Sequence, residues 1–146
     1  MNATWILVAD SARARLFEAD KAGALTELGC YTNAESRAGT RGLTTDRAPT
    51  VNESVGSARH SIEPHTSPRE KAAGLFARSL REVLDQGQHA NRFARLVLVA
   101  PPRFLGALHT AFGKLLRDSV VAEVRRDFTQ MSPGTIQARL PARAFH

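Results

Sequence analysis

The residues best suited to chemistry stand around Ser67, where the sequence predicts the start of a helix. Free backbone amides and a helix dipole equivalent to about half a positive charge make such a position suitable for an anion. Basic side chains flank it on both sides: Arg59, His60, His65 and Arg69. Together they can bind a phosphate of RNA or of a nucleotide. The alternative is that Glu63, Glu70 and the Ser67 hydroxyl satisfy the same amides internally, and both interpretations remain open.

The two histidines of this stretch raise the question of a metal site. His60 and His65 have Glu63 between them, but zinc needs at least a third ligand in a fixed geometry. Asp46 or Glu53 could supply that ligand only by chance, and histidines in loops are more commonly solvated. We therefore expect no metal and no other cofactor. A small phosphate- or metal-dependent enzyme centred on these histidines is kept as an alternative.

The acidic residues do not form a complete nuclease pattern. A nuclease of the ribonuclease H type needs several carboxylates around divalent metal ions. Asp10 ends the first predicted strand, and Glu70 and Glu82 lie on the first predicted helix. The fourth predicted strand, however, ends in Ala100-Pro101-Pro102 without an acid. We expect no catalytic residue, and Asp10 is most simply a turn residue that accepts hydrogen bonds from nearby amides.

Five stretches with strand patterns must position these residues. The first three are separated by tight turns and predict an antiparallel meander. A later run is apolar nearly throughout, as expected for a central strand that is covered on both faces. The strands are predicted at Thr4–Ala9, Arg13–Asp20, Ala24–Tyr31, Ala94–Ala100 and Ser119–Phe128.

Three stretches have helical periodicity. They run from Ser67 to about Gly87, from Pro102 to about Arg117, and from Gly134 to Leu140. Ser67 and Glu70 form a capping box, and Gly87 is the predicted C-cap of the first helix. The apolar stripe of the second helix includes Leu115.

The element order β-β-β-α-β-α-β-α predicts an α/β fold with a mixed five-stranded sheet and helices packed on its faces. This is the ribonuclease-H-like topology, and the length of 146 residues suits one domain over residues 1–146. Residues 32–66 have no regular pattern, and a loop of this length is usually functional or disordered. We expect a recognition loop that includes Asp46 and Arg47, with disordered filler as the alternative.

The net charge of +6 arises in the C-terminal part of the chain. Residues 89–146 hold nine basic and three acidic side chains, and only three of the chain's 20 basic residues are lysine. Arginine suits phosphate binding and stacking, although an arginine-rich composition also arises from a GC-rich genome. On the last predicted strand Arg125 and Arg126 should point to opposite faces. The predicted basic patch consists of Arg92, Arg95, Arg103, Lys114, Arg117, Arg125 and Arg126.

Cysteine content and the N-terminal sequence bear on the compartment. A single cysteine, Cys30, excludes an internal disulfide and suits a reducing compartment. The apolar run Trp5–Ala9 is too short for a membrane span and lacks the basic start of a signal peptide. We expect a cytoplasmic protein without a membrane span. The oligomeric state stays open, a homo-oligomer included.

Four stretches carry a resemblance to a known family. They are "WILVADSARARLFE", "TDRAP" at Thr45–Pro49, "SARHSIEPHTSPREKAAGLFARSL", and "LVLVAPPRFLGAL" at Leu96–Leu108. Together they resemble the bacterial host attachment protein family, named for a proposed role in attachment to host cells. That family is in turn similar to the middle domain of archaeal and eukaryotic peptide-chain release factors, which has the same topology.

The resemblance implies a function in translation that does not include catalysis of a reaction. In release factors a Gly-Gly-Gln motif before the first helix promotes hydrolysis of peptidyl-tRNA. Residues 32–66 contain no Gly-Gly and no glutamine, so release activity is not carried over. We therefore expect a non-catalytic domain that engages RNA or the ribosome through its long loop and basic C-terminal half. An indirect role in host or surface attachment is the second hypothesis, and the enzyme at the loop histidines is the third.

Overall fold

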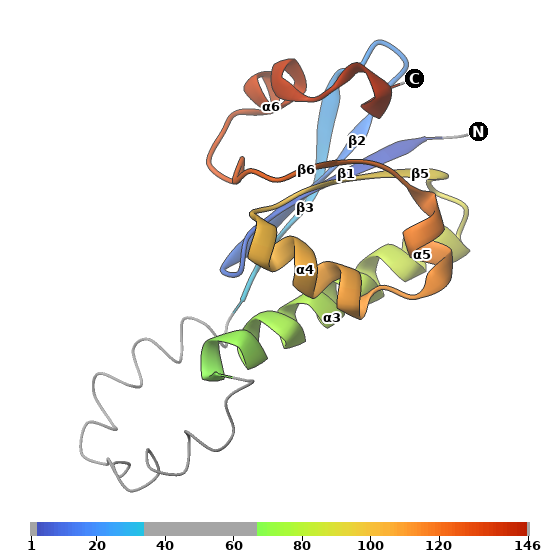
Figure 1. Ribbon diagram of the computed structural model, residues 1–146. Coiled ribbons are helices and arrows are strands. Elements are labelled where there is room, and N and C mark those ends of the chain that lie inside the picture. The colour runs from blue at the N-terminus through green and yellow to red at the C-terminus, as the bar shows by residue number, and fades with distance from the viewer. Residues whose placement is uncertain (1–2, 34–66, 146) are drawn as a thin grey trace, which may run out of the picture.

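The structure is a computed structural model that describes residues 3–33 and 67–145. Its strands form one sheet of mixed direction in the order β3-β2-β1-β5-β6 (Figure 1). The strands are β1 (Thr4–Ala9), β2 (Arg13–Ala19), β3 (Leu25–Thr32), β5 (Arg95–Val99) and β6 (Val120–Val124). β1 pairs antiparallel with β2 and parallel with β5. β2 and β3 are antiparallel, and β5 and β6 are parallel. The predicted meander and the mixed five-stranded sheet are confirmed.

Helices cover both faces of this sheet. They are α3 (Pro68–His89), α4 (Pro102–Ala111), α5 (Lys114–Ser119), α6 (Pro133–Arg139) and the 3-10 helix η1 (Ala142–Ala144). One face packs against α3, α4 and α5, and the other packs against α6 and η1 (Figure 1). All six residues of β1 are buried because it lies at the centre of the sheet. Its alternate side chains, such as Leu7 and Ile6, belong to the two different core clusters.

The first helix begins as predicted but ends later. Ser67 Oγ accepts a hydrogen bond from the Glu70 amide, and the Glu70 carboxylate accepts one from the Ser67 amide, so the capping box is confirmed. Gly87, however, lies inside the helix rather than at its cap, and it is buried. The residue that ends the helix in the left-handed conformation is Asn91, with φ of 57°. Asparagine tolerates this conformation better than most residues.

The prediction of the second helix as one continuous element is wrong. It divides into α4 and α5 at Phe112 and Gly113, both of which have extended backbones. Arg81 of α3 donates a hydrogen bond of 3.1 Å to the Ala111 carbonyl, which satisfies the end of α4. Phe112 is buried in the core, whereas Leu115, predicted on the apolar stripe, is 61% exposed.

The last strand is shorter than predicted, and this corrects the placement of two arginines. β6 ends at Val124, so Arg125 and Arg126 follow the strand and are exposed instead of facing opposite sides of it. The chain leaves the sheet here, and Phe128 is buried in the cluster beneath α6. The carboxylate of Asp127 then accepts the Thr129 amide at 2.9 Å, which fixes the following turn.

Candidate functional site

The carboxyl ends of β1, β5 and β6 share one edge of the sheet, because these three strands are parallel. In open α/β sheets this edge is the usual place for a ligand. Asp10 follows β1, Arg103 lies in the first turn of α4 after β5, and Arg125 follows β6. This edge, called the carboxyl edge below, is therefore the candidate functional site.

Both ends of the segment 34–66 are attached beside this edge. The buried side chain of Asn33 donates a 2.9 Å hydrogen bond to the Ser11 carbonyl and a 3.4 Å bond to the Ala72 carbonyl. Asn33 thus joins the turn after β1 to the first turns of α3. The predicted loop residues Asp46, Arg47, Arg59, His60 and His65 lie outside the described residues, so their placement stays a prediction.

Two carboxylates approach each other at the carboxyl edge. Asp10 Oδ1 accepts the Ala12 and Arg13 amides at 2.8 and 2.9 Å, as its predicted role of turn residue requires. The Thr129 hydroxyl, on a residue that is only 4% exposed, lies 2.6 Å from Asp127 Oδ1 and 3.5 Å from Asp10 Oδ2. A hydroxyl has a single proton, so the shorter contact identifies Asp127 as its acceptor.

The surroundings of Asp127 favour its ionised form. Partial burial acts to raise the pKa of this carboxyl. Hydrogen bonds from the Thr129 hydroxyl and amide and with the Asp10 side chain, together with the positive charge of Arg13, outweigh burial and lower the pKa below its ordinary value of 3.8. Asp127 is therefore a carboxylate at neutral pH and serves as the acceptor that holds the turn after β6.

Arg15 of β2 fixes the position of this turn. Its guanidinium donates to the carbonyls of Thr129 and Met131 at 3.1 and 2.6 Å. The same group forms a two-pronged ion pair with Glu27 of β3, at 3.1 and 3.2 Å. Because Arg15 is itself mostly buried, it holds the turn against the sheet with a defined geometry.

The acids considered for a nuclease do not gather. The Glu70 carboxylate is used in the capping box of α3, and Glu82 is exposed farther along the same helix. In the ranges 3–33 and 67–145, no group of three metal-binding side chains is found. The acid that does lie beside Asp10 is Asp127, which the sequence reasoning missed. The available signal was its position just after the last strand, at the same edge as Asp10.

The start of α3 offers little to an external phosphate. Pro68 has no amide proton, the Glu70 amide donates to Ser67, and the Lys71 amide makes the first helical bond. Of the first amides of α3, only that of Arg69 has no hydrogen bond within the described residues. The exposed Arg69 side chain can still contribute a positive charge beside the carboxyl edge, and its predicted binding role stays a prediction.

The predicted basic patch does not form one surface. Arg103, Arg125 and Arg126 are exposed at the carboxyl edge. The remaining members, Arg92, Arg95, Lys114 and Arg117, lie toward the opposite edge, where β5 and β6 begin. A strand of five residues at about 3.3 Å per residue separates the two edges by roughly 15 Å. No local sequence pattern indicates this separation, because it depends on how β5 and β6 pair in the sheet.

The two groups of basic residues also differ in their contacts. Arg92 lies over the Trp5 ring, and Arg95 donates to the Arg143 carbonyl at 2.9 Å. Lys114 pairs with Asp118 at 2.8 Å. Arg117 donates to the Phe112 carbonyl at 3.1 Å. By contrast, within residues 3–33 and 67–145 no hydrogen bond or ion pair involves the side chains of Arg103, Arg125 or Arg126.

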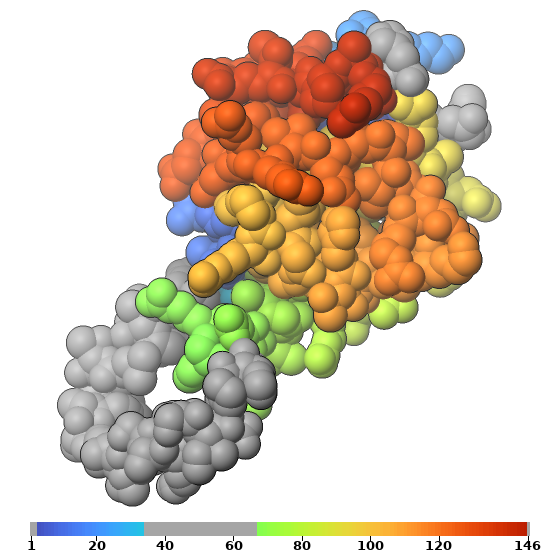
Figure 2. Space-filling model, viewed as in Figure 1, coloured from blue at the N-terminus to red at the C-terminus, as the bar shows by residue number. Residues whose placement is uncertain are grey.

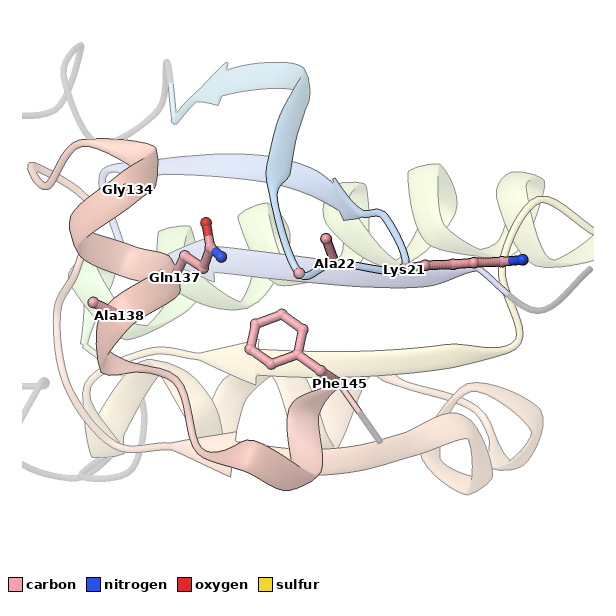
Figure 3. Close-up of a pocket in the computed structure, with 7 residues that line it drawn as sticks. Lys21, Ala22, Gly134, Gln137, Ala138 and Phe145 are labelled. Carbon is pink, nitrogen blue, oxygen red and sulfur yellow. The ribbon is translucent and has the colours of Figure 1, made fainter.

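A separate pocket lies away from the carboxyl edge, between the turn that joins β2 to β3 and the C-terminal residues. It has a volume of about 410 Å³, and Gln137 and Phe145 form its walls (Figure 3). Gly23 also lines the pocket, with a φ of 92°, a conformation that favours glycine. The pocket contains no acidic side chain, and the side chain of Lys21 extends away from Gln137 (Figure 3).

Among the helices of residues 3–33 and 67–145, none has both the length and the apolar character needed to cross a membrane. A solved structure, the Ppx/GppA phosphatase of Aquifex aeolicus in its type II variant, is 12% identical with a TM-score of 0.38. The match covers 85% of this chain but only 35% of that protein, and it carries no argument about activity.

Sequence comparisons give a more direct result. No curated protein sequence matches the chain. Neither the structural match nor the family match supports the resemblance to release factors. A family model described as "Protein required for attachment to host cells" matches residues 5–140, which is nearly the whole chain. The chain therefore belongs to the host attachment protein family.

Proposed function

We propose that the protein is a non-catalytic, cytoplasmic RNA-binding domain that engages RNA or the ribosome through its carboxyl edge, the adjoining segment 32–66 and its basic C-terminal half. The proposal includes a ribonuclease-H-like topology and a distant relation to release-factor middle domains. The strand order β3-β2-β1-β5-β6 supports the topology.

The observation that carries the proposal is that, within residues 3–33 and 67–145, no acidic side chain forms an ion pair with the arginines of the C-terminal half. Its three acids are engaged elsewhere: Asp118 by Lys114, Glu123 by His109, and Asp127 by Thr129. No ion pair within the described residues therefore neutralises the arginines between residues 89 and 145. A surface with uncompensated arginines attracts polyanions. Arg103, Arg125 and Arg126 combine this charge with exposure at the ligand-binding edge of the sheet.

The test is the binding of a fluorescein-labelled, 20-nucleotide single-stranded RNA, followed by fluorescence anisotropy from 50 to 300 mM salt. The test variant changes Arg103, Arg125 and Arg126 together to alanine. The matched control changes Lys21, Arg78 and Arg139, which are exposed elsewhere, and removes the same charge. We expect the test variant to weaken binding at least tenfold and the control less than about threefold.

The salt dependence separates local contacts from net charge. Each phosphate contact with a single strand contributes about 0.7 to the slope of log affinity against log salt. Loss of three contacts should therefore reduce the slope by about 2 in the test variant. Equal losses in both variants would contradict a site at the carboxyl edge, and no binding at 50 mM salt would contradict RNA binding. For the ribosome, a protein that stays in the soluble fraction at low and high salt contradicts that partner.

A role in attachment is the second candidate, and membership of the host attachment family favours it. We propose that such a role is indirect, since the protein is proposed to be cytoplasmic. Deletion of its gene should then reduce adhesion of cells to a host surface while antibody to the protein fails to label intact cells. Labelling of intact, unlysed cells would contradict an indirect role.

A further inference from the structure

The outer edge of β6 offers backbone groups for pairing. β6 is the last strand of the sheet, and no strand of the described residues pairs with its outer side. The Val124 carbonyl accepts the Ala100 amide, so Val124 directs its backbone groups toward β5. Successive residues of a strand direct these groups to opposite sides. The amide and carbonyl of Glu123 therefore point away from the sheet.

This edge lies at the molecular surface. In Figure 1 β6 runs between α6 on one side and α4 on the other. The same segment is visible in the space-filling view, between the red atoms of the C-terminal helices and the yellow-orange atoms of α4 (Figure 2). A hollow of about 590 Å³ follows the strand and is lined by Val120, Val121, Ala122, Glu123, Arg125 and Arg143.

The charge of the hollow is positive. Arg125 enters it from the end of β6 and Arg143 from η1, and both are exposed. Its one acid, Glu123, is held by His109 of α4, with Nε2 and Oε2 2.6 Å apart. An occupant therefore meets two arginines and the outward amide and carbonyl of Glu123, with the exposed Val121 as an apolar contact.

We propose that the outer edge of β6 binds an extended acidic segment of a partner protein, which adds to the sheet as a sixth strand and places carboxylates beside Arg125 and Arg143. Strand addition satisfies the outward amide and carbonyl groups, and charge selects the partner. RNA would contact the arginines but could not continue the backbone ladder. A second copy of this chain would place its own Arg125 and Arg143 beside those of the first copy, where like charges repel.

The probe is a fluorescent, seven-residue peptide that alternates Glu and Val, and its control alternates Lys and Val. Two variants share the loss of the Glu123 side chain and differ in the backbone. Glu123→Ala keeps the outward amide, whereas Glu123→Pro removes it without removing a bond to β5. We expect Glu123→Ala to bind the acidic peptide at least as tightly as the native protein. We expect Glu123→Pro and Arg143→Glu each to bind it at least tenfold more weakly, and the lysine peptide not to bind.

Hydrogen exchange gives a readout on the native protein that does not depend on the folding of the proline variant. Saturation with the acidic peptide should slow exchange of the Glu123 amide at least tenfold, with no comparable change in β2. Equal peptide binding by Glu123→Ala and Glu123→Pro would overturn the proposal, as would an unprotected Glu123 amide. Absence of peptide binding together with a concentration-dependent dimer in sedimentation would assign the edge to a second copy instead.

Discussion

Gly87 is the position where one added methyl group should test the packing of α3 on the sheet. A Cβ at Gly87 would lie 2.5 Å from Trp5 Cη2 and 2.6 Å from Cζ3. The Trp5 ring is 2% exposed and stacks on Phe93 with a centroid separation of 4.6 Å. The ring therefore has no open space to move into when Gly87 is replaced by alanine.

The expected magnitude follows from two opposing effects. Carbon atoms are in comfortable contact at about 3.5–4.0 Å, so the helix and the ring must separate by roughly 1 Å. Such overpacking costs about 1–3 kcal/mol. Alanine in place of glycine inside a helix contributes about 0.5–1 kcal/mol in the other direction. Because the ring is confined between α3 and Phe93, we expect a steric cost near the upper value. The net loss for Gly87→Ala is then about 2 kcal/mol in the free energy of unfolding.

Gly74 provides a matched control on the same helix. A Cβ at Gly74 meets nothing within 4 Å, so Gly74→Ala should show only the helix gain and stabilise the protein by about 0.5–1 kcal/mol. Urea unfolding followed by the fluorescence of the single tryptophan measures both changes. A Gly87→Ala variant that is as stable as Gly74→Ala would refute the described contact between α3 and Trp5.

Two further predictions concern the carboxyl edge. Asp10→Ala should lower the free energy of unfolding, measured in urea, by about 1 kcal/mol because the amides of Ala12 and Arg13 lose their acceptor. Asp10→Asn should lose less. Equal losses of stability in the two variants would contradict this role of Asp10. The lowered pKa of Asp127 adds stability above the ordinary value of 3.8, and this stability is lost as the pH falls through the folded-state pKa. Thr129→Val should therefore show a lower melting temperature than the native protein above about pH 5 and a smaller difference near pH 3, and a difference independent of pH would contradict the link to Asp127.

The sheet could be predicted from the sequence because its signals are local. The run at Thr4–Ala9 is apolar throughout, and this pattern alone indicates a strand that is buried on both faces. The ends of the helices were less predictable because they depend on distant residues. At the end of α4, for example, the Ala111 carbonyl accepts a hydrogen bond from Arg81 of α3, which is 30 residues away in the sequence. A glycine at position 87 suggests a C-cap. In the structure, glycine fits this position because a Cβ would clash with the Trp5 ring that packs against α3.

The candidate site was harder to predict than the fold. A nuclease pattern on the predicted strands and helices groups Glu70 and Glu82 with Asp10. The structure instead places Asp127 beside Asp10, with the Thr129 hydroxyl near both carboxylates. Thr129 and Asp10 are 119 residues apart in the sequence. The end of β6 before Arg125 and Arg126 could not be predicted, because no local pattern indicates that Phe128 is buried in the cluster beneath α6.

The hydrogen bonds at the carboxyl edge indicate that its acids have a structural role and that its arginines are available to a ligand. Asp10 Oδ1 accepts two amides, and Asp127 Oδ1 accepts the amide and the hydroxyl of Thr129. Within residues 3–33 and 67–145, Asp10 Oδ2 has one hydrogen bond, of 3.5 Å, with the Thr129 hydroxyl. A divalent metal needs several oxygen ligands in a defined geometry. The acids therefore fix the backbone turns at the carboxyl edge, where the side chains of Arg103 and Arg125 are exposed. This arrangement supports the proposed binding of an anionic partner at the carboxyl edge.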